Sequence, residues 1–113
     1  MDTLSRTFLA LADPTRRAIL AMIEDKAMTV NEIVEEQALS QPGISKHLKV
    51  LEEAGLIRRE RVAKTRPVHL DADGLKQAAG WIEHYRQYWE GAFGRMDTLI
   101  DQLNAEAEKN GRQ

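Results

Sequence analysis

Cysteine is absent from this chain of 113 residues. Without thiols, the chain can form neither a disulfide framework nor a thiolate metal site. The sequence also lacks any apolar run near the roughly 18 residues of a membrane span, and its N-terminus lacks the pattern of a signal peptide. We therefore expect a soluble, cytoplasmic protein that does not contact a membrane and folds as one domain, 1–113, with a modest core.

Common catalytic patterns are missing as well. The chain has no glycine-rich phosphate loop, and its three histidines fall in three different predicted elements. None of the three accompanies an obvious nucleophile. We therefore expect neither an enzyme nor a cofactor.

The charge is unevenly distributed along the chain. The formal net charge is −2, which is unusual for a protein that binds nucleic acid. Residues 40–70, however, carry 7 Lys and Arg against 3 Asp and Glu, a balance of +4. Screening limits electrostatic effects to about 8–10 Å, so a local basic patch can contact phosphates whatever the global sign.

A short capped helix is predicted within this basic segment, over 41–54. Ser40 suits the N-cap, Pro42 suits the first turn, and Gly55 suits the left-handed position that ends a helix. Apolar residues recur at i, i+4 and i+7 and predict a buried edge. They are Ile44, Leu48 and Leu51.

The opposite edge of this helix is polar and basic. Its side chains supply donors that suit base edges and phosphates, although an ordinary solvated face would have the same composition. These residues are Gln41, Ser45, Lys46, His47 and Lys49. His47 has two interpretations, a phosphate donor and a partly buried histidine bonded to the backbone.

The preceding segments predict three further helices. One spans 3–12, and Asp13-Pro14 is a typical N-cap and first residue for the next. Arg16 and Arg17 near its start are interpreted either as surface residues or as partners of a phosphate or an acidic group. Thr29 to Glu32 matches a capping box, and the short turn before 41–54 then predicts a helix-turn-helix over about 29–54.

Two short strands are predicted after Gly55, at 56–62 and 68–70. A small polar hairpin is not stable alone, but beside a helix-turn-helix it forms a wing, 56–70, that can reach a groove or the backbone of a duplex. The alternative is a solvated hairpin with a charged edge. The cations nearest its tip are Arg61, Lys64 and Arg66.

One long amphipathic helix is predicted over about 73–108. Apolar residues at alternating spacings of 3 and 4 form a heptad-like seam, which favours contact with a partner chain over packing within one monomer. On this helix the predicted dimer interface comprises Ile82, Tyr85, Trp89, Phe93, Met96, Leu99, Ile100 and Leu103.

The order of these elements, together with the sequence from Ser40 to Ile57, strongly resembles the ArsR/SmtB family of bacterial winged-helix repressors. The opening from Phe8 to Arg17 and the Leu70-Asp71 exit from the hairpin are similar to that family too. The resemblance covers roughly residues 5–103. It implies a mainly α fold with a small β-hairpin, a winged helix-turn-helix that dimerises through its first and long C-terminal helices. On the first helix, Leu4, Phe8 and Leu11 would then join the predicted dimer interface.

The resemblance also implies a function. The family binds double-stranded DNA as a homodimer and represses by occupying an inverted-repeat operator. By position, Ser40, Gln41, Ser45, Lys46, His47 and Lys49 would be recognition-helix contacts. Arg61, Lys64 and Arg66 would be wing contacts. The alternative is a winged-helix module that binds proteins without specific DNA binding, which the basic run 58–66 disfavours.

The sequence departs from the metal-sensing branch of that family. Those members carry a cysteine pair in the third helix, where this chain has Glu32 to Gln37. Its last predicted helix offers one histidine, His84, with scattered glutamates, which make a weak metal site. We therefore expect no metal and a closer similarity to the metal-independent autorepressors of the SdpR type. Trp81, Tyr85 and Trp89 are interpreted as dimer core or as the site of a small-molecule inducer.

Overall fold

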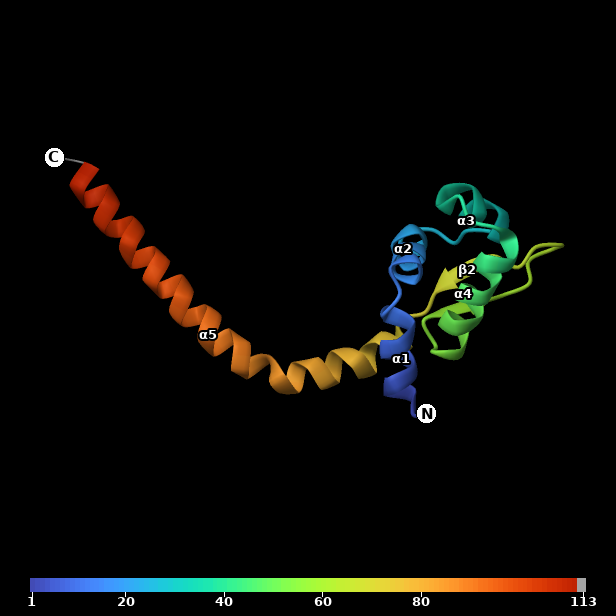
Figure 1. Ribbon diagram of the computed structural model, residues 1–113, viewed down its shortest axis with the longest axis horizontal. Coiled ribbons are helices and arrows are strands. Elements are labelled where there is room, and N and C mark those ends of the chain that lie inside the picture. Colours follow the sequence, from blue (N-terminus) through green and yellow to red (C-terminus); the bar gives the residue numbers. More distant parts are fainter. Residues whose placement is uncertain (112–113) are drawn as a thin grey trace. The chain divides into compact units, whose positions relative to one another are not determined.

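The computed structural model describes the backbone of residues 1–111 and the side chains of residues 1–90 and 99–107. The elements in chain order are α1 (Thr3–Leu11), α2 (Pro14–Ile23), α3 (Val30–Gln37), α4 (Gln41–Glu53), β1 (Ile57–Arg59), β2 (Val68–Leu70) and α5 (Asp73–Gly111) (Figure 1). The predicted mainly helical fold with one small hairpin is confirmed. The chain divides into two compact units, Met1–Ala79 and Gly80–Gln113, which are described separately.

Side-chain caps start the helices of the first unit where the sequence predicts them. The Asp13 carboxylate accepts hydrogen bonds from the backbone N–H groups of Thr15 and Arg16, at 2.8 and 3.1 Å. Thr29 and Glu32 form the reciprocal capping box of α3. The Ser40 hydroxyl accepts from the Gly43 N–H at 3.2 Å and begins α4. Each cap satisfies donors that have no partner inside the helix.

A three-residue turn joins α3 to α4. Ala38 adopts a left-handed conformation with φ 54°, and its N–H donates to the Val34 carbonyl oxygen at 3.0 Å. This backbone arrangement reverses the chain within residues 38–40, so α4 begins directly after the turn. The pair α3 and α4 is therefore a helix-turn-helix.

The core of the first unit lies between α1 to α4 and the hairpin. The predicted inner edge of α4 is fully buried, and the largest buried apolar side chains come from α2, α3, α4, β2 and the residue before β1. They are Ile19, Ile23, Ile33, Ile44, Leu48, Leu51, Leu56 and Val68. This burial fixes the rotation of α4 and leaves its polar edge toward solvent.

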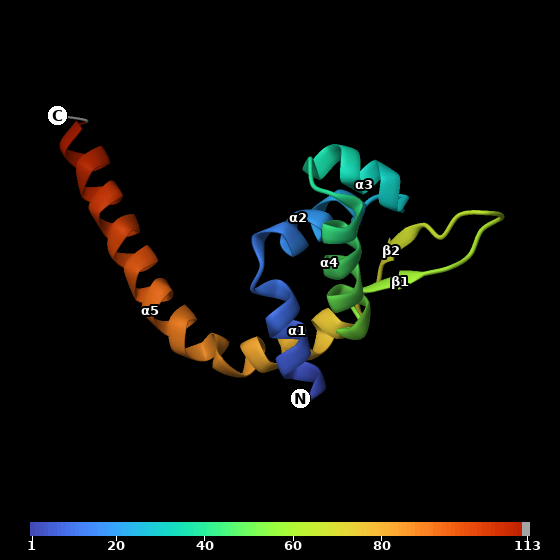
Figure 2. The same ribbon diagram turned by 45° about the vertical axis from the view of Figure 1, so that its right-hand side comes forward.

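The hairpin is antiparallel, with Ile57 opposite Leu70 and Arg59 opposite Val68. Backbone bonds between Met28 and Val68, at 2.7 and 3.1 Å, attach β2 to the segment before α3. Figure 2 shows the loop between the strands extending away from the helices of this unit.

The first strand is shorter than predicted: it ends at Arg59, and the expected strand 56–62 was wrong in length. Glu60 and Arg61 are exposed and charged, so no apolar face holds them against the unit. Pairing resumes only at the tip, where Val62 and Thr65 exchange two backbone bonds at 2.8 and 3.0 Å.

Candidate nucleic-acid interface

The outer edge of α4 presents the polar side chains that the sequence predicts. Burial of Ile44, Leu48 and Leu51 on the inner edge forces the residues between them outward. The exposed residues of this edge, with the N-cap, are Ser40, Gln41, Ser45, Lys46 and Lys49. His47 is half-buried at the boundary between the two edges. The fold therefore displays amide, hydroxyl and ammonium groups along one side of α4.

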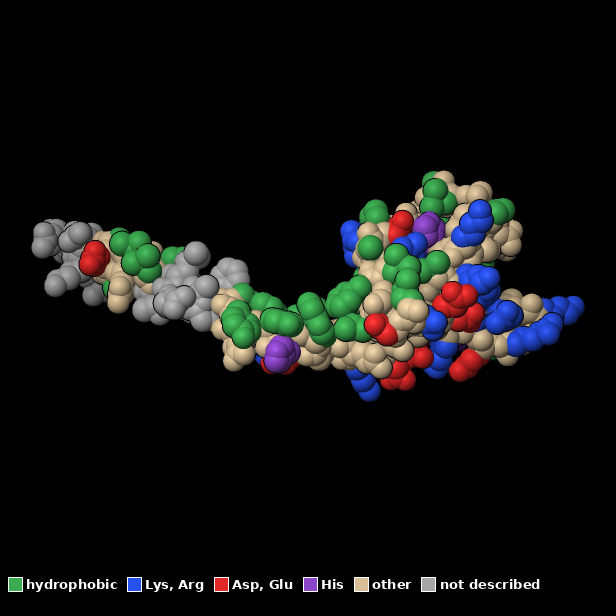
Figure 3. Space-filling view, turned by 60° about the horizontal axis from the view of Figure 1, so that its bottom comes forward, with side chains coloured by type: hydrophobic (Ala, Val, Ile, Leu, Met, Phe, Trp, Pro, Cys, Tyr) green, Lys and Arg blue, Asp and Glu red, His purple; other side chains and the backbone are tan. Residues whose placement is uncertain are grey.

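The hairpin presents the second group of cations. Arg61, Lys64 and Arg66 are exposed on either side of its tip. Ala63 takes a left-handed φ of 55° in the tight turn that connects them. Figure 3 shows Lys and Arg side chains gathered at the hairpin end of the first unit. The exposed apolar side chain of Val62 lies among these cations, a feature that the sequence patterns did not single out.

The seven cations of α4 and the hairpin fall into two groups by their partners. Arg58 forms an ion pair with Glu60 at 3.4 Å, and Arg59 donates to the Arg66 carbonyl oxygen at 3.3 Å. Within the part of the chain that the structure describes, no carboxylate lies within ion-pair distance of the other five. These five unpaired cations are Lys46, Lys49, Arg61, Lys64 and Arg66. They can bind phosphates without first breaking an internal ion pair.

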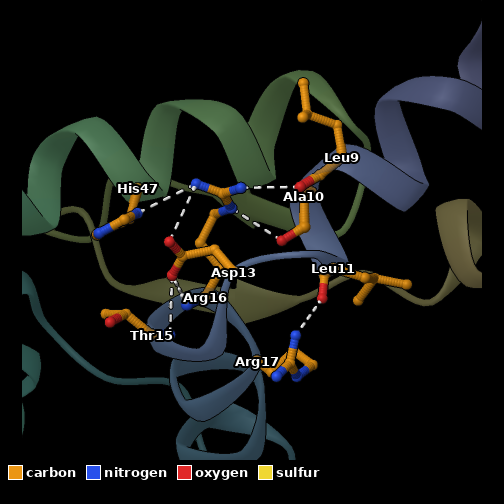
Figure 4. A network of polar contacts seen from close by, with 8 residues as sticks. All are labelled: Leu9, Ala10, Leu11, Asp13, Thr15, Arg16, Arg17 and His47. Carbon is orange, nitrogen blue, oxygen red and sulfur yellow. Dashed lines mark hydrogen bonds and ion pairs between the residues drawn. The ribbon is translucent and has the colours of Figure 1, made fainter.

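Arg16 connects the end of α1 to α4. Its side chain is only 13% exposed, which excludes the interpretation of a surface residue. It donates to the carbonyl oxygens of Ala10 and Leu9, both at 2.8 Å, and Nη1 lies 3.3 Å from Nδ1 of His47 (Figure 4). Sequence patterns could not reveal this contact, because Arg16 and His47 are 31 residues apart.

Hydrogen bonding lowers the pKa of the capping carboxylates. The pKa of Asp13 lies below its ordinary value, chiefly because the Arg16 backbone N–H donates to it; burial opposes this, and the Thr15 N–H adds to it. The pKa of Glu32 is lowered by the Thr29 backbone N–H and then by the Thr29 hydroxyl. Both carboxylates therefore stay ionised at neutral pH, as their capping roles need.

The second unit exposes a large apolar surface on α5, visible as the hydrophobic side chains along that helix in Figure 3. The exposed large side chains are Trp81, Ile82, Tyr85, Tyr88, Trp89, Leu99, Ile100 and Leu103. Tyr85 stacks at a tilt on Trp81, with ring centroids 5.0 Å apart. Phe93 and Met96, which the sequence also assigns to a dimer interface, lie outside the described side chains.

The predicted interface residues of α1 belong to the first unit. Leu4, Phe8 and Leu11 are half-buried, and Leu11 packs against the core. Leu9, on another side of α1, is exposed and was not predicted. The periodicity that selected the first three residues detects the side of a helix that faces its own core as readily as one that faces a partner.

The described residues contain no group of three His, Asp or Glu side chains placed to hold a metal ion. Glu83 and Glu90 instead both bind Arg86, at 3.2 and 2.6 Å. The rings of His84 and Tyr85 are perpendicular, with centroids 4.8 Å apart. Among the described helices, none is long and apolar enough to cross a membrane.

Comparisons with known proteins agree with this architecture. A helix-turn-helix domain model matches residues 11–60. The HTH-type transcriptional regulator Rv2034 of Mycobacterium tuberculosis is 37% identical over 97 residues, which cover 85% of this chain and 87% of that protein. The transcriptional repressor SdpR of Bacillus subtilis is 32% identical over 82 residues, covering 73% of this chain and 91% of the repressor.

A solved structure is similar over most of the chain. The crystal structure of the ArsR family transcriptional regulator RHA00566 superposes with a TM-score of 0.71 at 30% identity, covering 79% of this chain and 98% of that one. The helix-turn-helix, the hairpin and these relatives agree on one assignment. The chain belongs to the ArsR family of winged helix-turn-helix regulators, which are DNA-binding transcriptional regulators.

Proposed function

We propose that this chain is a homodimeric repressor that reads an inverted-repeat operator with α4 and contacts the DNA phosphates beside it with its hairpin. The observation that carries the proposal is the set of five unpaired cations on α4 and the hairpin. The similarity to SdpR, which is named as a transcriptional repressor, supports repression rather than activation.

Base readout is assigned to the first turns of α4. Gln41 is exposed at the first position of the helix, and its carboxamide can pair bidentately with adenine. Ser45 lies one turn further along the same edge, and Ser40 is the exposed N-cap. Lysines and arginines of the interface contact phosphates, which set register and affinity but carry little sequence information.

The dimer is assigned to α5 together with α1. A lone helix with so many exposed aromatic and aliphatic side chains is unfavourable in water, and pairing with a second copy would bury them. The residues we assign are those of the predicted interface, Phe93 and Met96 included. Two-fold symmetry would then place two α4 helices about one DNA turn apart, roughly 34 Å, which calls for an inverted-repeat operator.

DNA binding is proposed to need no metal. The chain has no cysteine, and the glutamates near His84 are engaged by Arg86. We assign Trp81, Tyr85 and Trp89 to dimer contact rather than to an inducer site. In this proposal residues 1–113 act as one DNA-binding domain in the cytoplasm. The helix-turn-helix and the hairpin contact the operator, and α5 joins the two copies that bind it.

Selection from a pool of randomised duplexes tests the proposal. The purified protein is mixed with the pool at about 150 mM salt, with a chelator present. Enrichment of an inverted repeat with half-sites near one turn apart is the expected result. Enrichment only after a metal is added would contradict metal independence. No enrichment with or without metals would overturn the repressor and favour the protein-binding winged helix.

A further inference from the structure

The guanidinium of Arg16 is held in one orientation by the end of α1. Nε donates to the Ala10 carbonyl oxygen and Nη2 to the Leu9 carbonyl oxygen, both at 2.8 Å. These carbonyls belong to the last turn of α1, where few acceptors have partners within the helix; the Leu9 oxygen also accepts from the N–H of the C-cap Ala12, at 3.2 Å. Two bonds to one rigid plane leave the guanidinium little freedom to rotate, so the direction of Nη1 is fixed.

Nη1 meets the ring of His47 on α4, at 3.3 Å from Nδ1. A guanidinium has five N–H donors and no acceptor, so Nδ1 has to provide the lone pair for this bond. In a neutral imidazole the proton then lies on Nε2. Figure 4 shows the second ring nitrogen of His47 directed away from Arg16.

Asp13 completes the surroundings without changing this assignment. Its Oδ2 lies 4.0 Å from Nη1 of Arg16, and its Oδ1 accepts the backbone N–H groups of Thr15 and Arg16. The carboxylate is thus engaged with the start of α2 and with the guanidinium.

We propose that Arg16 is a positioning residue for operator binding: it holds His47 in the tautomer whose Nε2–H donates to a phosphate of the operator. This inference rests on the proposed function, in which α4 faces DNA. What it adds is that Arg16, a residue outside the helix-turn-helix, determines which ring nitrogen of His47 can donate a hydrogen bond to the duplex.

Arg17 provides a matched control within the same helix. Its Nη1 donates to the Leu11 carbonyl oxygen at 2.7 Å, so Arg17 also binds the end of α1. Unlike Arg16, it is exposed, and its hydrogen bond in the structure is with α1 and not with α4. A role confined to joining α1 and α2 is therefore shared by both arginines, whereas contact with His47 distinguishes Arg16.

Nitrogen NMR of isotopically labelled imidazole rings tests the first step without DNA. The wild-type protein and Arg17→Met should show His47 with Nδ1 unprotonated and Nε2 protonated. Arg16→Met should shift this signature toward a mixture of tautomers. Protonated Nδ1 in the neutral ring of the wild type, or an unchanged signature in Arg16→Met, would overturn the proposal.

Operator affinity tests the second step, with variants that replace one ring nitrogen at a time. In His47→Gln the amide reaches the position of Nε2, whereas in His47→Asn it reaches only that of Nδ1. We expect His47→Asn to weaken binding about tenfold, the effect of about 1.4 kcal/mol, and His47→Gln to weaken it much less. Equal losses, or a larger loss for His47→Gln, would contradict the proposal. This comparison leaves Arg16 in place, so it does not depend on whether Arg16→Met folds.

A double-mutant cycle joins the two steps. Arg16→Met should weaken operator binding in the wild-type background but change it less than about twofold when His47 is already alanine. Additive losses would mean that Arg16 acts through the fold rather than through His47. If the wild type binds no duplex, the proposed function fails; if it binds and His47→Ala binds equally well, only the present inference fails.

Discussion

Gly74 at the start of α5 lies directly against the backbone of Ala54 at the end of α4. A Cβ at position 74 would be 2.7 Å from the Ala54 carbonyl oxygen and 3.1 Å from that of Gly55. Backbone atoms cannot move away as a flexible side chain can. We therefore expect Gly74→Ala to lower the free energy of unfolding by about 1–3 kcal/mol, as overpacking does.

Gly80→Ala is the control, because a Cβ at Gly80 would meet nothing within 4 Å. It should raise the free energy of unfolding by up to about 1 kcal/mol through helix propensity. Urea unfolding at one fixed protein concentration measures both variants. A neutral Gly74→Ala would show that the close approach of α5 to the end of α4 is not tight in solution.

The turn of the helix-turn-helix contains strain that glycine would relieve. Ala38 adopts φ 54°, a conformation that costs an L-residue roughly 1–2 kcal/mol. Ala38→Gly should therefore stabilise the protein by about 0.5–1 kcal/mol, after the entropy cost of glycine. The same change at Ala21, an exposed position inside α2, should destabilise by about 1 kcal/mol. Thermal unfolding of the two variants would show opposite signs, and equal signs would disagree with this conformation.

Acid should weaken the fold through its helix caps. The pKa of Asp13 is lower in the folded state, chiefly because the Arg16 N–H donates to it. A depressed pKa contributes stability that is present above the unfolded-state pKa, near pH 4, and is lost as the pH falls through the folded-state value. Between about pH 4 and pH 2, the thermal stability of Asp13→Asn should therefore decrease less than that of the wild type. A pH profile identical to the wild type would refute this role of the carboxylate.

A charge on the apolar seam of α5 should separate the proposed dimer. Tyr85 belongs to the predicted interface and is 41% exposed, whereas Tyr88 is not among the predicted interface residues and is 67% exposed. Tyr85→Glu should convert dimer to monomer in sedimentation experiments because it would bury an unpaired carboxylate between the chains. Tyr88→Glu is the control and should keep the dimer. Dissociation by Tyr88→Glu, with a stable dimer of Tyr85→Glu, would contradict the assignment of Tyr85 to the interface.

Local features of the fold were predictable from the sequence. Caps at Asp13, Thr29 and Ser40 depend on residues within three positions, and the buried edge of α4 follows from helical spacing. The left-handed Gly55 was predictable too, since glycine favours that conformation. These signals were sufficient to place the helix-turn-helix and the hairpin after it.

Features that depend on distant residues were not predictable. The contact between Arg16 and His47 joins two helices, and no periodicity records it. Ala38 adopts its left-handed conformation without the glycine that would have signalled it. The sequence also did not show which hairpin arginines form ion pairs. In the folded structure Arg58 pairs with Glu60, whereas no carboxylate of the described residues lies within ion-pair distance of Arg61.

The salt dependence of operator binding tests the central claim most directly. With all five unpaired cations on phosphates in both copies, log Kd should rise with log salt with a slope of about 9. The triple variant Arg61→Ala, Lys64→Ala, Arg66→Ala should fold normally and lower that slope by about 5, whereas Lys76→Ala, which removes a lysine already paired with Asp73, should leave it unchanged. A slope unchanged in the triple variant would contradict the claim that the hairpin cations hold the DNA backbone.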